Sequence, residues 1–305
     1  MRIFLIIPIL FIFLASCSNS NDFDIPQISK LEKLEEHSNQ FIKGIYSYDN
    51  GIHVAVGFGI ANSIMVEGDG GNIIIDTTDD VSQAKEVLSE FQKINQNPIK
   101  AIIYTHNHGD HVFGASEFYN SQEEKPLVIA HSTTAEKVEK ILGIINPIIT
   151  LRSGKMFGTN LDDDELINVG LGPYLSAGRT SPGYIAPTMT FEKELKLELA
   201  GHKVELYHAP GETDDQLFVW FPELSALMPG DNFYTTFPNL YTIRGTSHRD
   251  VIGWVNSIDK MRSLDPQYLF PSHTMPIVGE EISNALIIYR DGMQYVHDQT
   301  VRLMN

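Results

Sequence analysis

The sequence predicts an α/β protein in which two β-sheets pack face to face and helices cover their outer faces. Three observations support this. Short apolar runs bounded by turn residues recur in both halves, segments with helical spacing lie between them, and the composition is globular, with 305 residues of which 42% are hydrophobic. Residues 43–305 contain no repeat and no Pro/Ser-rich linker, so we expect them to form a single domain.

In the first half, residues 23–42 read as a polar, partly helical lead-in. Residues 81–94 are predicted to form a helix because Val81, Ala84, Val87, Leu88 and Phe91 share one face at helical spacing. Apolar runs that end at turn residues predict strands. These strands are expected at residues 52–58, 61–66, 72–76 and 99–104.

The second half repeats this style without repeating the sequence. Strands are predicted at residues 126–130, 195–199, 203–208, 217–221, 226–229 and 268–271, and helices at residues 133–142, 250–261 and 280–304. Residues 143–190 are rich in Gly, Pro and Asp and show little periodicity. A loop of that length in a compact domain is usually functional, so we interpret it as an insertion or lid over the active site.

Charge and cysteine content exclude several kinds of site. The chain has 22 Lys+Arg against 39 Asp+Glu, a formal charge of −17, which argues against a nucleic-acid partner because phosphate binding needs clustered basic residues. The single Cys excludes an intramolecular disulfide and any Cys-rich metal site. A metal ion would therefore be bound by His and carboxylate side chains.

The N-terminus predicts export. Residues 3–15 carry no charge and form an apolar run too short to span a membrane, so residues 1–16 read as a signal peptide. Leu14-Ala15-Ser16-Cys17 resembles the bacterial lipobox, which implies a lipid anchor at Cys17 and a tether and lead-in over residues 17–42. The expected location is the bacterial cell envelope, on the periplasmic side of the outer membrane or at the cell surface. An ordinary secreted protein is the alternative.

The strongest local signal is Thr105-His106-Asn107-His108-Gly109-Asp110-His111, which follows the predicted strand 99–104 directly. Imidazoles and a carboxylate this crowded would leave donors and charges unpaired in a core, and a divalent cation resolves that conflict. Extended backbone points His106 and His108 to one side. Asp110 and His111 lie beyond the Gly109 turn and can serve a second ion. A solvated polar loop is the alternative, which the density of the cluster disfavours.

One metal needs at least three protein ligands, so partners are expected at other strand ends. Candidate ligands do follow three later predicted strands. They are found in His208-Ala209-Pro210-Gly211-Glu212-Thr213-Asp214-Asp215, in Gly230-Asp231 and in Ser272-His273.

The His-x-His-x-Asp-His cluster, the strand ending in Asp76, and the downstream Glu212, Asp231 and His273 resemble the metallo-β-lactamase superfamily. The resemblance implies an αβ/βα sandwich of two mixed sheets with two Zn²⁺ ions between the sheet edges. It also makes residues 43–305 a catalytic domain. His/carboxylate sets accept several divalent metals, so Mn²⁺ and Fe²⁺ stay open.

Glu212 stands where most members of the superfamily have His, and this looks like the alkylsulfatase branch. Further similarities to that branch are Met156-Phe157-Gly158, Gly170-Leu171-Gly172, Ala186-Pro187-Thr188 and the run from Phe237 to Gly245. Two features depart from it. The bridging residue is Asp231 instead of Glu, and the C-terminal regions of full-length alkylsulfatases have no counterpart, which leaves affinity for long-chain esters open.

The resemblance also implies residue roles. The first zinc would bind His106, His108 and Glu212, the second would bind Asp110, His111 and His273, and Asp231 would bridge them. A metal-bound water or hydroxide would act as nucleophile or base. Arg244 and Asn239 would hold the sulfate. Asp76 would orient a ligand imidazole, and Asp215 and His208 are further candidates for support of the ligands, although a packing role for His208 is the preferred reading.

The function expected from these residues is hydrolysis of a small sulfate ester by a dinuclear zinc site. A Glu at position 212 makes the site one charge less positive than a His would, which favours a singly charged sulfate ester over a doubly charged phosphate monoester. Two alternatives stay open. One is another hydrolase of the same fold, acting on a phosphodiester, lactone or β-lactam, and the other is a non-catalytic metal- or ligand-binding lipoprotein.

Overall fold

The first sheet contains seven strands in chain order. A computed structural model describes residues 30–162, 165–175 and 182–305, so the predicted signal peptide and Cys17 lie outside the described residues. β1 to β4 pair antiparallel, and β4 to β7 pair parallel. The strands are β1 (Gly44–Ser47), β2 (Ile52–Val56), β3 (Ser63–Gly68), β4 (Gly71–Ile75), β5 (Ile99–Ile103), β6 (Leu127–His131) and β7 (Met189–Phe191).

The second sheet contains six strands in the order β13-β12-β11-β10-β9-β8. Only β11 and β12 pair in parallel, so this sheet is mixed as well. Its strands are β8 (Glu194–Leu199), β9 (His202–His208), β10 (Leu217–Phe221), β11 (Ala226–Met228), β12 (Tyr268–Leu269) and β13 (Ile277–Val278).

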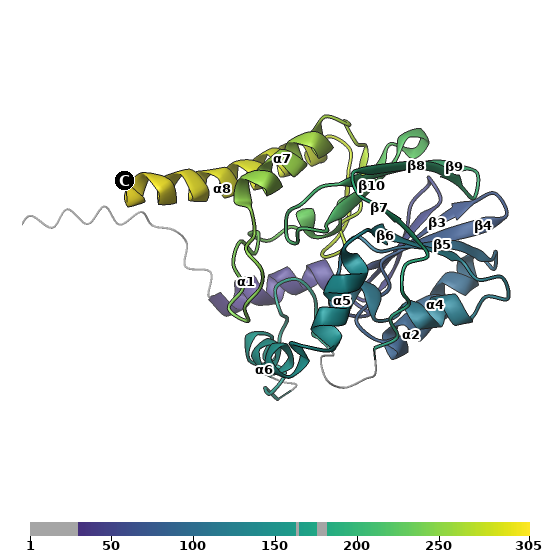
Figure 1. The fold of residues 1–305 in the computed structure, drawn as a ribbon, viewed down its shortest axis with the longest axis horizontal. Helices are drawn as coiled ribbons and strands as arrows, with labels where there is room; N and C mark the ends of the chain where they lie inside the picture. The colour runs from purple at the N-terminus through teal and green to yellow at the C-terminus, as the bar shows by residue number, and fades with distance from the viewer. Residues whose placement is uncertain (1–29, 163–164, 176–181) are drawn as a thin grey trace, which may run out of the picture.

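Helices cover the outer face of each sheet (Figure 1). The longer ones are α2 (Val81–Ile94), α5 (Thr134–Leu142), α6 (Asn146–Met156), α7 (Val251–Arg262) and α8 (Glu281–Met304), and the shorter ones are α1 (Lys30–His37), α3 (Gly109–Val112) and α4 (Ala115–Asn120). Single 3-10 turns lie at η1 (Ser38–Phe41), η2 (Pro222–Leu224) and η3 (Gly230–Asn232). None of the helices in the described part of the chain is both long and apolar enough to cross a membrane.

Alternation of side chains along the strands produces the layers. Ile73 and Ile75 of β4 face the second sheet and pack in a core with Leu206 and Val219. Ile74, between them, faces the other way and packs with Phe91 of α2. The second sheet packs its outer face against α7 and α8 through Trp254 and neighbouring side chains. The predicted two-sheet sandwich with outer helices is therefore confirmed.

Residues 143–190 contain more structure than the sequence predicts. They include α6 and the start of β7. Pro147 stands in the first turn of α6, where its missing N–H costs nothing. Among the α6 side chains only Ser153 is buried, so the helix lacks the buried apolar face by which helices are recognised in a sequence. The expectation of a long irregular loop was wrong for this part of the segment.

Candidate metal centre

The histidine loop begins where β5 ends, beside the end of β4. These two strands are parallel neighbours, so Asp76 after β4 lies next to Thr105 after β5. Asp76 has a φ of 57°, a left-handed conformation that Asp tolerates better than most residues. Its carboxylate accepts hydrogen bonds from the Thr105 N–H (2.9 Å), the Thr105 hydroxyl (2.9 Å), His111 Nδ1 (2.7 Å) and the Ser272 hydroxyl (2.7 Å). One buried carboxylate thus ties three strand ends together.

Hydrogen bonds fix the tautomers of three imidazoles. His111 Nδ1 donates to Asp76, and His273 Nδ1 donates to the Ile60 carbonyl at 2.8 Å. The Thr105 hydroxyl proton is used on Asp76, so at 3.0 Å from His106 Nδ1 the hydroxyl oxygen is the acceptor. With each Nδ1 proton engaged, the Nε2 atom is the one left to bind a metal.

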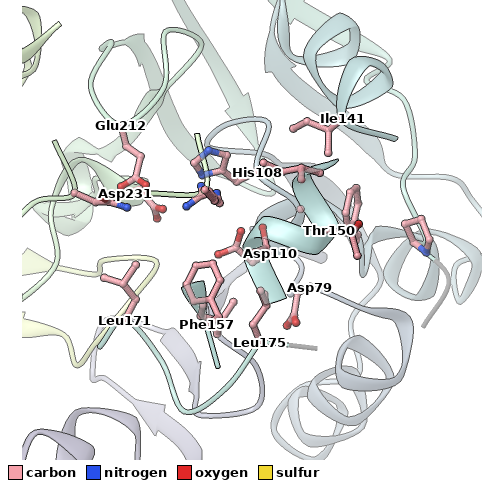
Figure 2. Close-up of a pocket in the computed structure, with 18 of the residues that line it drawn as sticks. Asp79, His108, Asp110, Ile141, Thr150, Phe157, Leu171, Leu175, Glu212 and Asp231 are labelled. Carbon is pink, nitrogen blue, oxygen red and sulfur yellow. The ribbon is translucent and has the colours of Figure 1, made fainter. Parts of the chain in front are cut away.

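These Nε2 atoms meet around Asp231, which follows β11. Its carboxylate oxygens lie 3.6 Å from His106 Nε2, 3.4 Å from His111 Nε2 and 3.2 Å from His273 Nε2. The described residues contain two groups of candidate ligands, and within each group the ligand atoms all lie within 4.8 Å of one another. The first group is His106, His108 and Asp231, and the second is Asp110, His111 and His273. Figure 2 shows His108, Asp110 and Asp231 directed into one cavity.

The donor set fits divalent cations. In the described part of the chain, His106 Nε2, His111 Nε2 and Asp231 Oδ1 are buried and have no hydrogen-bond partner. Burial, together with His111, lowers the pKa of His106 to about 4, so its Nε2 carries a lone pair. Burial also acts to lower the pKa of His273, but Asp231 and Asp110 outweigh it and raise the pKa to about 9. Without a metal, protons on imidazole balance the carboxylates, and a cation would displace them.

Glu212 lies on the same cavity but has different neighbours. The Arg249 guanidinium lies 3.0 Å from Glu212 Oε1, and the Tyr234 hydroxyl donates to Oε2 at 3.2 Å. Burial raises the pKa of Glu212, and the Arg249 charge opposes that rise. Gly211 before it is required by close approach, because a Cβ there would collide with the Asn232 side chain. The structure groups Asp231, not Glu212, with His106 and His108.

Asp215 and His208 have separate places. Asp215 is buried and accepts from the Asn107 side chain (2.5 Å) and the Thr134 hydroxyl (2.7 Å), so it supports the histidine loop from behind. His208 stacks on His131 with ring centroids 4.2 Å apart, and its Nε2 donates to the Asp214 carbonyl at 2.8 Å. Neither of these contacts is with a candidate metal ligand. The role of His208 as a support of the ligands stays a prediction.

The centre forms the polar end of a cavity of about 450 Å³. Asn239 and Arg244 line the same cavity, and their contacts to an anion stay a prediction. Arg244 is half-buried, with its guanidinium 5.8 Å from the centre of the Phe157 ring, and burial lowers its pKa. The rest of the wall is largely apolar (Figure 2) and includes Phe113, Ile141, Leu142, Ile149, Phe157, Leu171 and Leu175. Most of this wall comes from residues 143–190.

Sequence reasoning missed Arg249 and Tyr234. A buried carboxylate such as Glu212 requires a positively charged partner, and this was the available signal. The requirement does not identify which Arg is the partner, and Arg249 lies 37 positions away in a segment without helix or strand. Tyr234 stands next to Phe233 without any motif around it, and it packs in a hydrophobic core.

Two packed sheets with outer helices, and a His/carboxylate centre at the strand ends, are typical of a metal-binding α/β domain. The Metallo-beta-lactamase superfamily matches residues 56–273, and the chain belongs to that superfamily, as its motifs predict. The family implies binding of divalent metal. The chain is 39% identical over 248 residues to a linear primary-alkylsulfatase of a Pseudomonas sp. strain, covering 79% of this chain and 47% of that one. It is 27% identical to an alkyl/aryl-sulfatase of Saccharomyces cerevisiae, covering 87% of this chain and 42% of that one.

Solved structures show the same fold. The stereoselective inverting sec-alkylsulfatase Pisa1 of Pseudomonas sp. superposes with a TM-score of 0.82 at 24% identity, covering 90% of this chain and 45% of that one. A metallo-beta-lactamase of Pontibacter korlensis superposes with a TM-score of 0.56 at 16% identity, covering 82% and 98%. The chain spans less than half the length of the alkylsulfatases it resembles.

Replacing Asp76 with Asn should lower zinc affinity and activity by about 10–100-fold. Asn tolerates the left-handed backbone of this position but presents a weaker, neutral acceptor to His111 Nδ1. Asp265→Asn is the matched control, because Asp265 also has a positive φ (51°) and is exposed. Zinc competition with a chromogenic chelator measures the effect. Equal zinc affinities for the two variants would show that Asp76 does not orient the His111 ligand.

Proposed function

We propose that this chain is a zinc-dependent hydrolase of alkyl sulfate esters. The observation that carries the proposal is a single cavity with three parts: a His/carboxylate centre, the Arg244 guanidinium, and an apolar wall. An ester with a charged sulfate head and an apolar tail matches all three. Relatives named as alkylsulfatases support this choice of substrate class.

Two Zn²⁺ ions fit the two ligand sets. His106 and His108 with Asp231 would hold one ion, with Glu212 adjacent, and Asp110, His111 and His273 would hold the other. Asp231 approaches imidazoles of both sets, which supports a role for it as a ligand shared by both ions. When bound, zinc would activate water and polarise the ester oxygen.

The protein's own side chains bind and orient the ester. Arg244 presents a planar fork of donors that suits an oxyanion, and Asn239 lines the cavity beside it. Asp76 and the Ile60 carbonyl keep the Nδ1 protons of His111 and His273 away from the cavity. The apolar wall excludes water from the far side, which strengthens the charge interactions inside.

The tail subsite is testable with two neighbouring residues of α6. Ile149 lines the cavity, whereas Ile148 points to solvent and is 58% exposed. We expect Ile149→Asp to raise the KM for dodecyl sulfate by about tenfold or more, since loss of a buried Ile contact costs about 1.5–3 kcal/mol. Ile148→Asp should leave KM near the wild-type value.

Steady-state release of inorganic sulfate from dodecyl and butyl sulfate measures both variants. The Ile149 effect should shrink for butyl sulfate, because a short tail reaches less of the wall. An equal rise in KM for both esters in Ile149→Asp, or an equal rise in Ile149→Asp and Ile148→Asp, would show that this wall does not bind the alkyl chain.

A further inference from the structure

Two buried side chains, Arg249 and Tyr234, connect the Glu212 carboxylate to Asn239. Arg249 Nη2 lies 3.0 Å from Glu212 Oε1, and Arg249 Nη1 donates to the Asn239 carbonyl. The Tyr234 hydroxyl donates to Glu212 Oε2 at 3.2 Å and accepts from the Asn239 N–H at 2.8 Å. Each oxygen of one carboxylate is thus linked, through a different side chain, to a different backbone group of one residue.

This double link acts on a segment that has no regular secondary structure of its own. Residues 233–250, between η3 and α7, contain no helix or strand, yet they carry both Asn239 and Arg244 to the cavity. Leu240 packs against the core beside α7 and α8, and Thr242 is buried, whereas Tyr241 and Ile243 are 79% and 87% exposed. The peptide of Asn239 itself is held by two hydrogen bonds that end on the Glu212 network.

Burial makes these contacts hard to replace. Glu212 is 3% exposed, Arg249 4% and Tyr234 0%, so water cannot take over a lost partner. A buried donor or acceptor left without a partner costs more than an ordinary hydrogen bond contributes. A carboxylate has about four lone-pair sites, so Glu212 can keep both contacts while it also faces a metal.

We propose that Arg249 and Tyr234 are positioning residues that hold the backbone of Asn239 at a fixed position relative to the Glu212 carboxylate. They thereby align the anion-binding segment 237–245 with the metal centre. The inference deepens the proposed function and rests on it where sulfate recognition is concerned. The link itself, from the Glu212 carboxylate to the Asn239 backbone, is independent of which ester is cleaved.

Hydrogen–deuterium exchange of the zinc-loaded full chain tests the link directly. In Tyr234→Phe and in Arg249→Met, amides of residues 236–245 should exchange about tenfold faster, because a charge-assisted or buried hydrogen bond to Asn239 is lost. Peptides from α2 should exchange as in the wild type, and zinc content should be unchanged. Arg249→Lys keeps a charge beside Glu212 but lacks the fork, so its exchange should lie between wild type and Arg249→Met.

Kinetics on the same variants separates positioning from general stability. The KM for dodecyl sulfate should rise about tenfold while kcat changes by less than about threefold, because the anion contacts are misplaced and the metal centre is intact. Tyr268→Phe and Arg262→Met are the controls: Tyr268 donates to exposed Asp49, and Arg262 pairs with Asp259 on α7. Both controls should match the wild type in exchange and in KM.

Unchanged exchange over residues 236–245 in both Tyr234→Phe and Arg249→Met would overturn the inference, even for an active enzyme. A wild-type protein that cleaves no sulfate ester would instead overturn the proposed function and leave the exchange result to decide the link. Tyr234→Phe and Arg249→Lys remove few atoms, so they carry the test if Arg249→Met does not fold.

Discussion

Replacing His106 with Ala should lower the hydrolysis of dodecyl sulfate by about a thousandfold or more, which exceeds the roughly 10–100-fold effect of residues that only orient a ligand. His106 is completely buried, and its Nε2 has no hydrogen-bond partner within the described residues. Its removal leaves His108 and Asp231 as the remainder of one ligand set, and two ligands hold zinc weakly.

The measurement pairs metal analysis with an assay of sulfate release. We expect His106→Ala to retain about one zinc per chain and the wild type to retain two after dialysis against a weak chelator. His297→Ala is the control because His297 lies on α8 and contacts only Asp298 among the interactions found for it. Wild-type zinc content and rate in His106→Ala would refute the assignment of this ligand set.

Replacing Arg244 with Met should lower kcat/KM for dodecyl sulfate by about 10–100-fold, since a hydrogen bond to a charged group contributes about 1.5–3 kcal/mol. Arg244 lines the cavity beside Phe157 of the apolar wall and is half-buried, so water screens its charge less than at the surface. Met keeps much of the aliphatic length and the contact with Phe157 but removes the planar fork.

Inorganic sulfate gives a second measure of the same residue. Its inhibition constant should rise by a similar factor in Arg244→Met, and zinc content should be unchanged. Arg302→Met is the control, because Arg302 is exposed at the end of α8. If the inhibition constant of sulfate is the same for Arg244→Met and Arg302→Met, then another group binds the anion.

The strands and long helices were predictable because each carries its own periodic pattern. The limits of α2 and β10 agree with the prediction, since α2 has a continuous apolar face and β10 is an unbroken apolar run between turns. β1 was missed because its residues are half-buried and show no alternation; pairing with β2 defines it. β13 has only two residues and is likewise defined by its partner, β12.

The centre of the site was predictable to the extent that local spacing determines it. The histidine cluster is dense, and each remaining candidate follows a strand, so parallel and mixed pairing brings Asp76, Asp231 and His273 to one edge. Contacts made through an irregular segment were not predictable. Arg249 reaches Glu212 only because residues 233–250 fold back over the strand ends, and no periodicity in the sequence encodes that path.

Hydrolysis of four substrates by the purified, zinc-loaded chain tests the central claim most directly. The substrates are dodecyl sulfate, dodecyl phosphate, bis-p-nitrophenyl phosphate and nitrocefin, each assayed before and after removal of metal with a strong chelator. We predict hydrolysis of dodecyl sulfate that disappears on chelation, returns with Zn²⁺, and exceeds the hydrolysis of the other three. Turnover of dodecyl phosphate or nitrocefin at an equal or higher rate, or undiminished sulfate release from the metal-free protein, would contradict it.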